Sequence, residues 1–107
     1  MTQIHVVIRR INPALKIDLV QIGRIKDGRF DVLSLGAIAS SPIAHYFKSS
    51  HISDSLYVEH SEISNLVGAC EALPGFNVEF FDNTFVLMFD FDLNYDEGAT
   101  KEEGKGN

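Results

Sequence analysis

The chain has little cysteine, no tryptophan and no long apolar run: among its 107 residues, Cys70 is the only thiol. A single cysteine excludes an internal disulfide framework and is typical of a reducing compartment. The longest apolar run, 85–89, is far shorter than the roughly 20 residues of a membrane-spanning helix. The first residues carry their positive charge after the apolar ones, so we expect no signal peptide, no membrane partner and a cytoplasmic protein.

Catalytic motifs are also missing. The sequence has no G-x-S-x-G, no phosphate-binding glycine loop and no glycine-rich strand-to-helix turn. Cys70 falls in an apolar stripe, where a thiol is inert, because reactive thiols need electropositive and partly exposed surroundings. The four histidines, His5, His45, His51 and His60, match no zinc spacing. We therefore expect a protein that is not an enzyme and that uses no metal and no cofactor.

One acidic run partly matches a calcium-binding loop. From Asp92 to Glu103, oxygen-bearing side chains occupy loop positions 1, 3, 5 and 12. Position 6 should be glycine for the sharp turn, but it is Glu97, and the usual flanking helices are not expected here. We interpret the run as a solvated acidic stretch.

Charge is distributed unevenly along the chain. Residues 1–50 contain seven Lys or Arg and three Asp, whereas residues 51–107 contain two Lys and twelve Asp or Glu. The halves therefore carry +4 and −10, within a total of −6. This split predicts one basic and one acidic surface, unless the fold interleaves the two halves.

The stretch Phe76–Leu93 contains six of the eight phenylalanines and alternates with a period of two. That pattern predicts a β-hairpin, with Asp82-Asn83 as a two-residue turn. The predicted cross-strand pairs are Phe80 with Phe85, Val78 with Leu87 and Phe76 with Phe89. This register places these residues, Phe80 included, on one buried face.

The N-terminal half predicts a three-strand meander over residues 4–11, 16–25 and 30–35. Asp27-Gly28 between the last two strands is a strong hairpin signal. A two-residue turn would pair Arg24 with Asp31, Ile22 with Leu33 and Val20 with Leu35. A three-residue loop with a bulge at Gly28 remains open, because the shorter turn sets Lys26 opposite Arg29. We expect the middle strand to be central.

Two helices are predicted between these β regions. Ser40-Ser41-Pro42 is a helix start that opens a short helix. After a short strand at 56–58, Ser61 is expected to cap a second helix, which Pro74-Gly75 ends. Its apolar residues follow helical spacing and form one stripe: Ile63, Leu66, Val67, Cys70 and Leu73.

The resulting fold class is α+β in a single domain over residues 1–93. An antiparallel sheet of about five strands combines the N-terminal three-strand meander with the C-terminal Phe-rich hairpin, and one or two helices pack on one face. Residues 94–107 lack apolar anchors and are expected to form a flexible acidic and glycine-containing tail.

The preferred hypothesis for function is a small acidic protein that acts by protein–protein contact, as an inhibitor or adaptor. The outer face of the predicted hairpin combines apolar residues with carboxylates, as contact surfaces do. The partner would be another protein with basic character, or a second copy in a homodimer. The expected contact residues are Glu79, Phe81, Val86, Met88, Asp90 and Asp92.

The alternative is single-stranded nucleic-acid binding by the N-terminal sheet, where positive charge would follow the backbone and rings would stack on bases. Its candidate residues are Arg9, Arg10, Lys16, Arg24, Lys26, Arg29 and Phe30. The negative net charge and the isoelectric point near 5.0 disfavour this alternative.

Overall fold

The structure, a computed structural model, describes residues 1–10, 13–50 and 55–93. Within these ranges it has an antiparallel sheet of seven strands, one α-helix and four short 3-10 segments. The strands are β1 (Thr2–Arg10), β2 (Ile17–Lys26), β3 (Arg29–Leu33), β4 (Lys48–Ser49), β5 (Leu56–Glu59), β6 (Asn77–Phe81) and β7 (Thr84–Phe91). The helix is α1 (Ile63–Glu71), and the 3-10 segments are η1 (Pro13–Leu15), η2 (Leu35–Ile38), η3 (Ala44–Tyr46) and η4 (His60–Glu62). The fold is therefore α+β, with more strands than the five expected.

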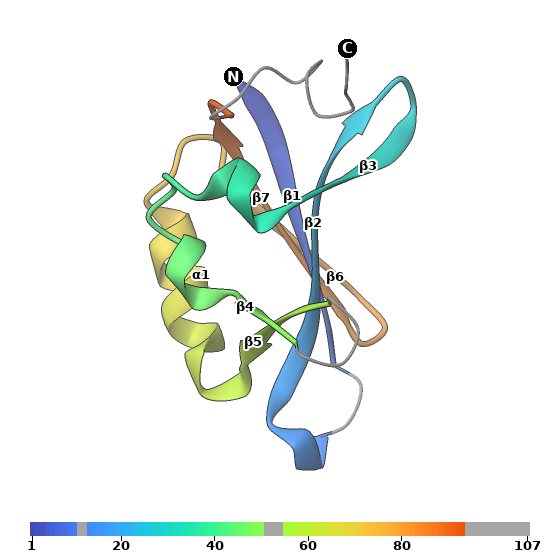
Figure 1. Cartoon of the computed structure of the whole chain (residues 1–107), viewed down its shortest axis with the longest axis vertical. Helices are drawn as coiled ribbons and strands as arrows, with labels where there is room; N and C mark the ends of the chain where they lie inside the picture. The colour runs from blue at the N-terminus through green and yellow to red at the C-terminus, as the bar shows by residue number, and fades with distance from the viewer. Residues whose placement is uncertain (11–12, 51–54, 94–107) are drawn as a thin grey trace.

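Strand β1 joins the two predicted β regions into one sheet (Figure 1). It pairs with β2 along one edge and with β7 along the other, both antiparallel. The strand order is β4-β5-β2-β1-β7-β6, and β3 pairs with the end of β2 that β5 leaves free. The N-terminal meander is confirmed, with β2 as its middle strand.

Both hairpins turn over two residues, as the sequence predicts. Asp27 and Gly28 have φ of 53° and 76°, and Asp82 has φ of 54°, the left-handed conformation that such turns require. The predicted pairs Arg24–Asp31 and Phe80–Phe85 are confirmed, so the alternative with a bulge at Gly28 is wrong.

The predicted pairing of Val20 with Leu35 is also wrong. Strand β3 ends at Leu33, and Leu35 begins a 3-10 segment. Val20 pairs instead with Leu56 of β5, which is the predicted short strand. Strand β2 is longer than β3, so β5 can pair with the part of β2 that β3 does not reach.

The core lies between the sheet and α1. Alternate residues of β1, namely Ile4, Val6 and Ile8, are buried on the face that we call the core face. From the helix, Leu66 and Cys70 are fully buried against this face, which confirms the predicted stripe. Figure 1 shows α1, η2 and η3 on the same side of the sheet. The opposite side, which we call the outer face, has no helix from the described residues.

The prediction of a helix after Ser40 is wrong. The chain forms only the 3-10 segment η3 there, although the Ser41 hydroxyl accepts a hydrogen bond from the Ile43 N–H at 3.3 Å. Phe47 ends the segment in an extended conformation and is buried in the core. Burial of this aromatic ring directs the chain into β4 before an α-helical turn can develop. The later helix begins at Ile63, two residues after the predicted cap Ser61.

No helix in residues 1–10, 13–50 or 55–93 is both long and apolar enough to cross a membrane. The predicted tail, 94–107, and most of the acidic run that begins at Asp92 lie outside the described residues.

Gly23 of β2 provides a test of the packing between β2 and β3. A Cβ atom at this position would overlap the Phe30 ring and would lie 2.8 Å from the Asp31 backbone oxygen. Because the backbone oxygen cannot move cheaply, we expect Gly23→Ala to lower the free energy of unfolding by about 1–3 kcal/mol in urea denaturation. The control is Gly68→Ala in α1, where a Cβ meets no atom within 4 Å and should raise stability by about 0.5–1 kcal/mol. Equal effects at both positions would contradict this packing.

Candidate functional site

The free edge of the sheet at β6 is the most unusual surface of the described chain. Among the described residues, β6 pairs only with β7. Its two adjacent phenylalanines are exposed: Phe80 at 68% and Phe81 at 56%. Because side chains alternate along a strand, Phe80 lies on the core face and Phe81 on the outer face. The edge strand thus presents an aromatic ring on each side.

The exposure of Phe80 corrects the prediction that it is buried. Its register is as predicted, and its ring stacks on Phe85 with centroids 4.7 Å apart. However, α1 packs on β7, and Phe80 is not among the residues that pack against the core. No local signal marks this exposure, because the alternation correctly places Phe80 on the core face and Phe81 on the outer face.

The backbone of β6 offers hydrogen-bonding groups to an additional strand. In a hairpin with a two-residue turn, the residues that flank the turn bond to each other, and successive residues then alternate between inward and outward groups. Phe81 flanks the turn, so Phe80 and Val78 point their N–H and C=O groups away from β7. The Val78 N–H accordingly donates to the Asn77 side-chain Oδ1 at 3.0 Å. The outward groups of Phe80 remain at the open edge.

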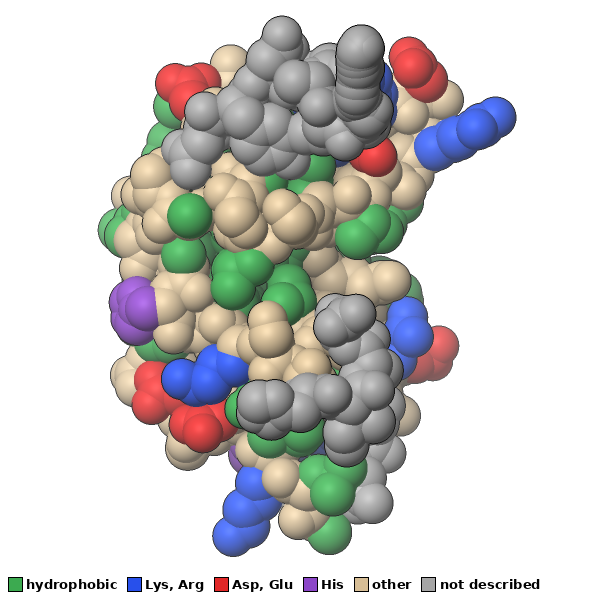
Figure 2. All heavy atoms as spheres, in the orientation of Figure 1, with side chains coloured by type: hydrophobic (Ala, Val, Ile, Leu, Met, Phe, Trp, Pro, Cys, Tyr) green, Lys and Arg blue, Asp and Glu red, His purple; other side chains and the backbone are tan. Residues whose placement is uncertain are grey.

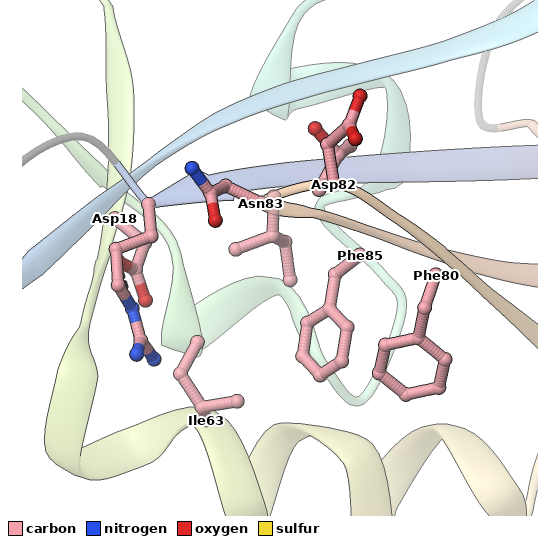
Figure 3. Close-up of a pocket in the computed structure, with 9 residues that line it drawn as sticks. Asp18, Ile63, Phe80, Asp82, Asn83 and Phe85 are labelled. Carbon is pink, nitrogen blue, oxygen red and sulfur yellow. Dashed lines mark ion pairs between the residues drawn. The ribbon is translucent and has the colours of Figure 1, made fainter.

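A hollow of about 240 Å³ lies beside the same hairpin, on the core face (Figure 3). Figure 3 shows the rings of Phe80 and Phe85 projecting from the hairpin towards Ile63, at the start of α1. The side of the hollow nearer to β2 is polar, where Arg10 and Asp18 line it. This hollow continues the exposed surface of β6 towards the helix.

Asp18 is a buried carboxylate with two compensating neighbours. Arg10 Nε lies 3.6 Å from Asp18 Oδ1, and His60 Nδ1 lies 3.3 Å from Asp18 Oδ2. The Arg10 Nη2 atom also lies 3.1 Å from His60 Nδ1. The three residues connect β1, β2 and η4, and a buried charge compensated in this way has a structural role. Among the described residues, no group of three or more His, Cys, Asp or Glu side chains could hold a metal ion.

The structure divides the predicted contact residues into exposed and buried ones. Val86 and Met88 are only 6% exposed, and both lie on β7, which has β1 on one side and β6 on the other. The sequence predicted that these two residues form the centre of an exposed patch, and this prediction is wrong because both are buried.

The acidic contact residues are less buried. Glu79 is exposed beside Phe81. Asp92 is also exposed, and its Oδ1 atom lies 3.7 Å from the N-terminal ammonium group. Asp90 is half-buried next to Gly75.

The residues of the nucleic-acid alternative do not form one basic track. Arg24 is 3% exposed and pairs with Asp31 at 3.0 Å, so it is not available to a ligand. Arg10 is held at Asp18. The remaining exposed candidates lie near the ends of strands: Arg9, Lys16, Lys26, Arg29 and Phe30. Figure 2 accordingly shows Lys and Arg side chains at several separate places.

Two exposed carboxylates lie on β6 and its turn, although Arg9 is opposite Thr84 beside the turn and Arg10 lines the neighbouring hollow. Residues 55–93 contain no Lys or Arg, and the β6–β7 hairpin with its turn contains Glu79, Asp82 and Asp90. Glu79 and Asp82 are exposed on the edge strand and at its turn. A partner at this edge is therefore expected to carry positive charge.

Comparison with protein-family models, with curated proteins and with solved structures finds no match for this chain. The function must therefore be argued from the geometry.

Two phenylalanines of the hairpin should respond differently to truncation. Phe89 is 0% exposed in the core, so Phe89→Ala should lower the free energy of unfolding by roughly 3–5 kcal/mol. Phe80 is largely exposed and contacts mainly Phe85, so we expect Phe80→Ala to cost about 1 kcal/mol or less. Urea denaturation of both variants measures the difference. A large loss for Phe80→Ala would show that this ring is covered in solution.

The thiol of Cys70 should be inert in the folded protein. Burial raises the pKa of Cys70 from 9.0 to about 11. At pH 8 the thiolate fraction is then roughly a hundredfold lower than in the unfolded chain, so labelling by a disulfide reagent should be slower by at least about that factor. Because the folded pKa lies above the unfolded one, this group should also make the protein lose stability as the pH rises from 9 to 11. Equal labelling rates with and without urea would contradict the burial.

Proposed function

We propose that the protein is a non-enzymatic binding domain that captures an extended segment of a basic protein partner on the free edge of β6. The observation that carries the proposal is the pair Phe80 and Phe81, exposed on opposite faces of an edge strand with outward backbone groups. Proteins normally protect such edges with Lys, Pro or bulges, because an exposed edge is a template for strand pairing. Strand β6 has none of these three devices in residues 77–81.

In this mode the main chain supplies part of the affinity and the side chains supply the specificity. A segment added to β6 would bond to the outward groups of Phe80 and to the C=O of Val78. Its side chains would alternate between the two faces, so that one set contacts Phe80 beside the hollow and the other set contacts Phe81.

Charge decides what kind of segment fits. Glu79 lies in the middle of β6 and Asp82 at its turn, and both are exposed. A lysine or arginine opposite Glu79 would form a cross-strand pair of opposite charges, whereas a carboxylate there would be repelled. An extended segment that alternates apolar and basic residues therefore matches this edge.

A labelled octapeptide of alternating lysine and valine tests the proposal by fluorescence anisotropy with the full chain. We expect saturable binding that is lost when the backbone nitrogens of the peptide are methylated, because methylation removes its hydrogen-bond donors. A glutamate–valine peptide should not bind. On the protein, Glu79→Lys should weaken binding about fivefold by reversing the cross-strand charge pair.

A second variant targets the backbone itself. Phe80→Pro removes the outward N–H without removing a bond to β7, and proline is tolerated at such edge positions. It should weaken binding by about tenfold or more, since a hydrogen bond and a ring are lost together. The control is Leu15→Lys, which changes an exposed apolar residue of η1, an element outside the sheet. Equal binding of the methylated peptide, or an equal loss in the Leu15 variant, would overturn the proposal.

A further inference from the structure

We infer that Asn77 determines how far a captured segment pairs along β6, because its side chain occupies the Val78 N–H in place of a partner's C=O group. This inference rests on the proposed function and specifies which part of the edge recognises the segment. It makes Asn77 a specificity-determining residue of that site.

The outward backbone groups of β6 form a short ladder. Val78 and Phe80 both point their N–H and C=O groups away from β7, which gives two donors and two acceptors. The Asn77 Oδ1 atom accepts one of the two N–H groups, that of Val78, at 3.0 Å. We call this hydrogen bond the Asn77 cap. A partner strand is therefore offered one uncapped donor, at Phe80, together with both acceptors.

The backbone around Asn77 is anchored to β7. Asn77 pairs with Met88, and at the same end of the hairpin the Asp90 N–H donates to the Pro74 carbonyl oxygen at 2.8 Å. The backbone groups of Asn77 thus pair inward, whereas its side chain bonds to the next N–H on the free edge. This anchoring keeps the amide oxygen beside the N–H group that it accepts.

The Asn77 cap competes with a ligand and does not exclude one. Asn77 is exposed, so its amide group can turn into water when a partner carbonyl approaches. The bond gained at Val78 would then replace a bond that the free protein already makes, and its net contribution to binding would be close to zero. A bond to the Phe80 N–H has no such internal competitor and contributes as an ordinary hydrogen bond.

The consequence is a site whose affinity is concentrated at the turn end of β6. A segment residue opposite Phe80 gains main-chain bonds and contacts the exposed ring. Segment residues beyond Val78 add little, because the donor that they would use is capped. We therefore expect the protein to select a short stretch of sequence next to Phe80 and to tolerate changes in the residues beyond Val78.

Amide hydrogen exchange of the full chain, followed by NMR, tests the Asn77 cap without a ligand. Relative to their rates in the unfolded chain, the Val78 amide should exchange about fivefold more slowly than the Phe80 amide, because it is bonded to Asn77. Asn77→Ala should remove this difference. Asn77→Asp keeps an oxygen at the same position and should retain it.

Titration with the lysine–valine octapeptide tests the consequence for binding. Asn77→Ala should bind this peptide about fivefold more tightly than the unmodified protein does, because binding then gains a full hydrogen bond at Val78. Saturating peptide should slow exchange at Phe80 in both proteins, and at Val78 only in the variant. The matched control is Glu79→Ala, which shortens the next side chain on the same face without removing the cap and should weaken binding.

Three outcomes would overturn the inference: equal protection of Val78 and Phe80 in the unmodified protein, no gain in affinity for Asn77→Ala, or an equal gain for Glu79→Ala. Each of them leaves the proposed function standing as long as the peptide protects the Phe80 amide. If the peptide protects that amide in neither protein, the proposed function itself fails, and the inference fails with it.

Discussion

The double pairing of β1 is the constraint on which the rest of the structure depends. Val6 is opposite Ile22 of β2 and opposite Leu87 of β7, so a single strand aligns the registers of both hairpins. A one-residue slip of β1 would turn its three buried side chains to the outer face and remove the layer that α1 covers. Neither hairpin alone presents enough apolar surface to be stable in water. The core forms only because β1 joins them.

The exposed edge follows from the difference in size between the sheet and its cover. A single α-helix with its side chains is about 10 Å wide, whereas a row of six neighbouring strands is roughly 24 Å wide at about 4.8 Å between strands. The helix α1 can cover the middle of the core face, where Leu66 and Cys70 are buried, but not the edge strand. Phe80 is therefore left beside a hollow rather than within the core. The absence of positive charge from residues 55–93 then gives this edge its acidic character.

Local sequence patterns predicted much of the fold and less of the candidate site. Both turns were readable because aspartate and glycine or asparagine tolerate positive φ, and each turn fixes the register of its hairpin. The helix stripe was readable because it spans more than two turns. The structure of the segment after Ser40 was not predicted correctly from its local pattern, because burial of Phe47 there outweighs the local capping signal. The site residues Val86 and Met88 were misplaced because alternation identifies two faces of a strand but not the neighbours on either side.

The sequence by itself determined which residues alternate, where the chain reverses and which half carries each charge, because these properties depend on neighbours within a few positions. The sequence also indicated that β2 is central, but only the tertiary structure decided that β1 and β7 are central and that β6 is an edge. That choice depends on pairings between distant segments, such as β1 with β7, whose register no local signal specifies. The difference between central and edge strands also explains why Phe89 is buried and Phe80 is exposed, although both follow the same alternation in one hairpin.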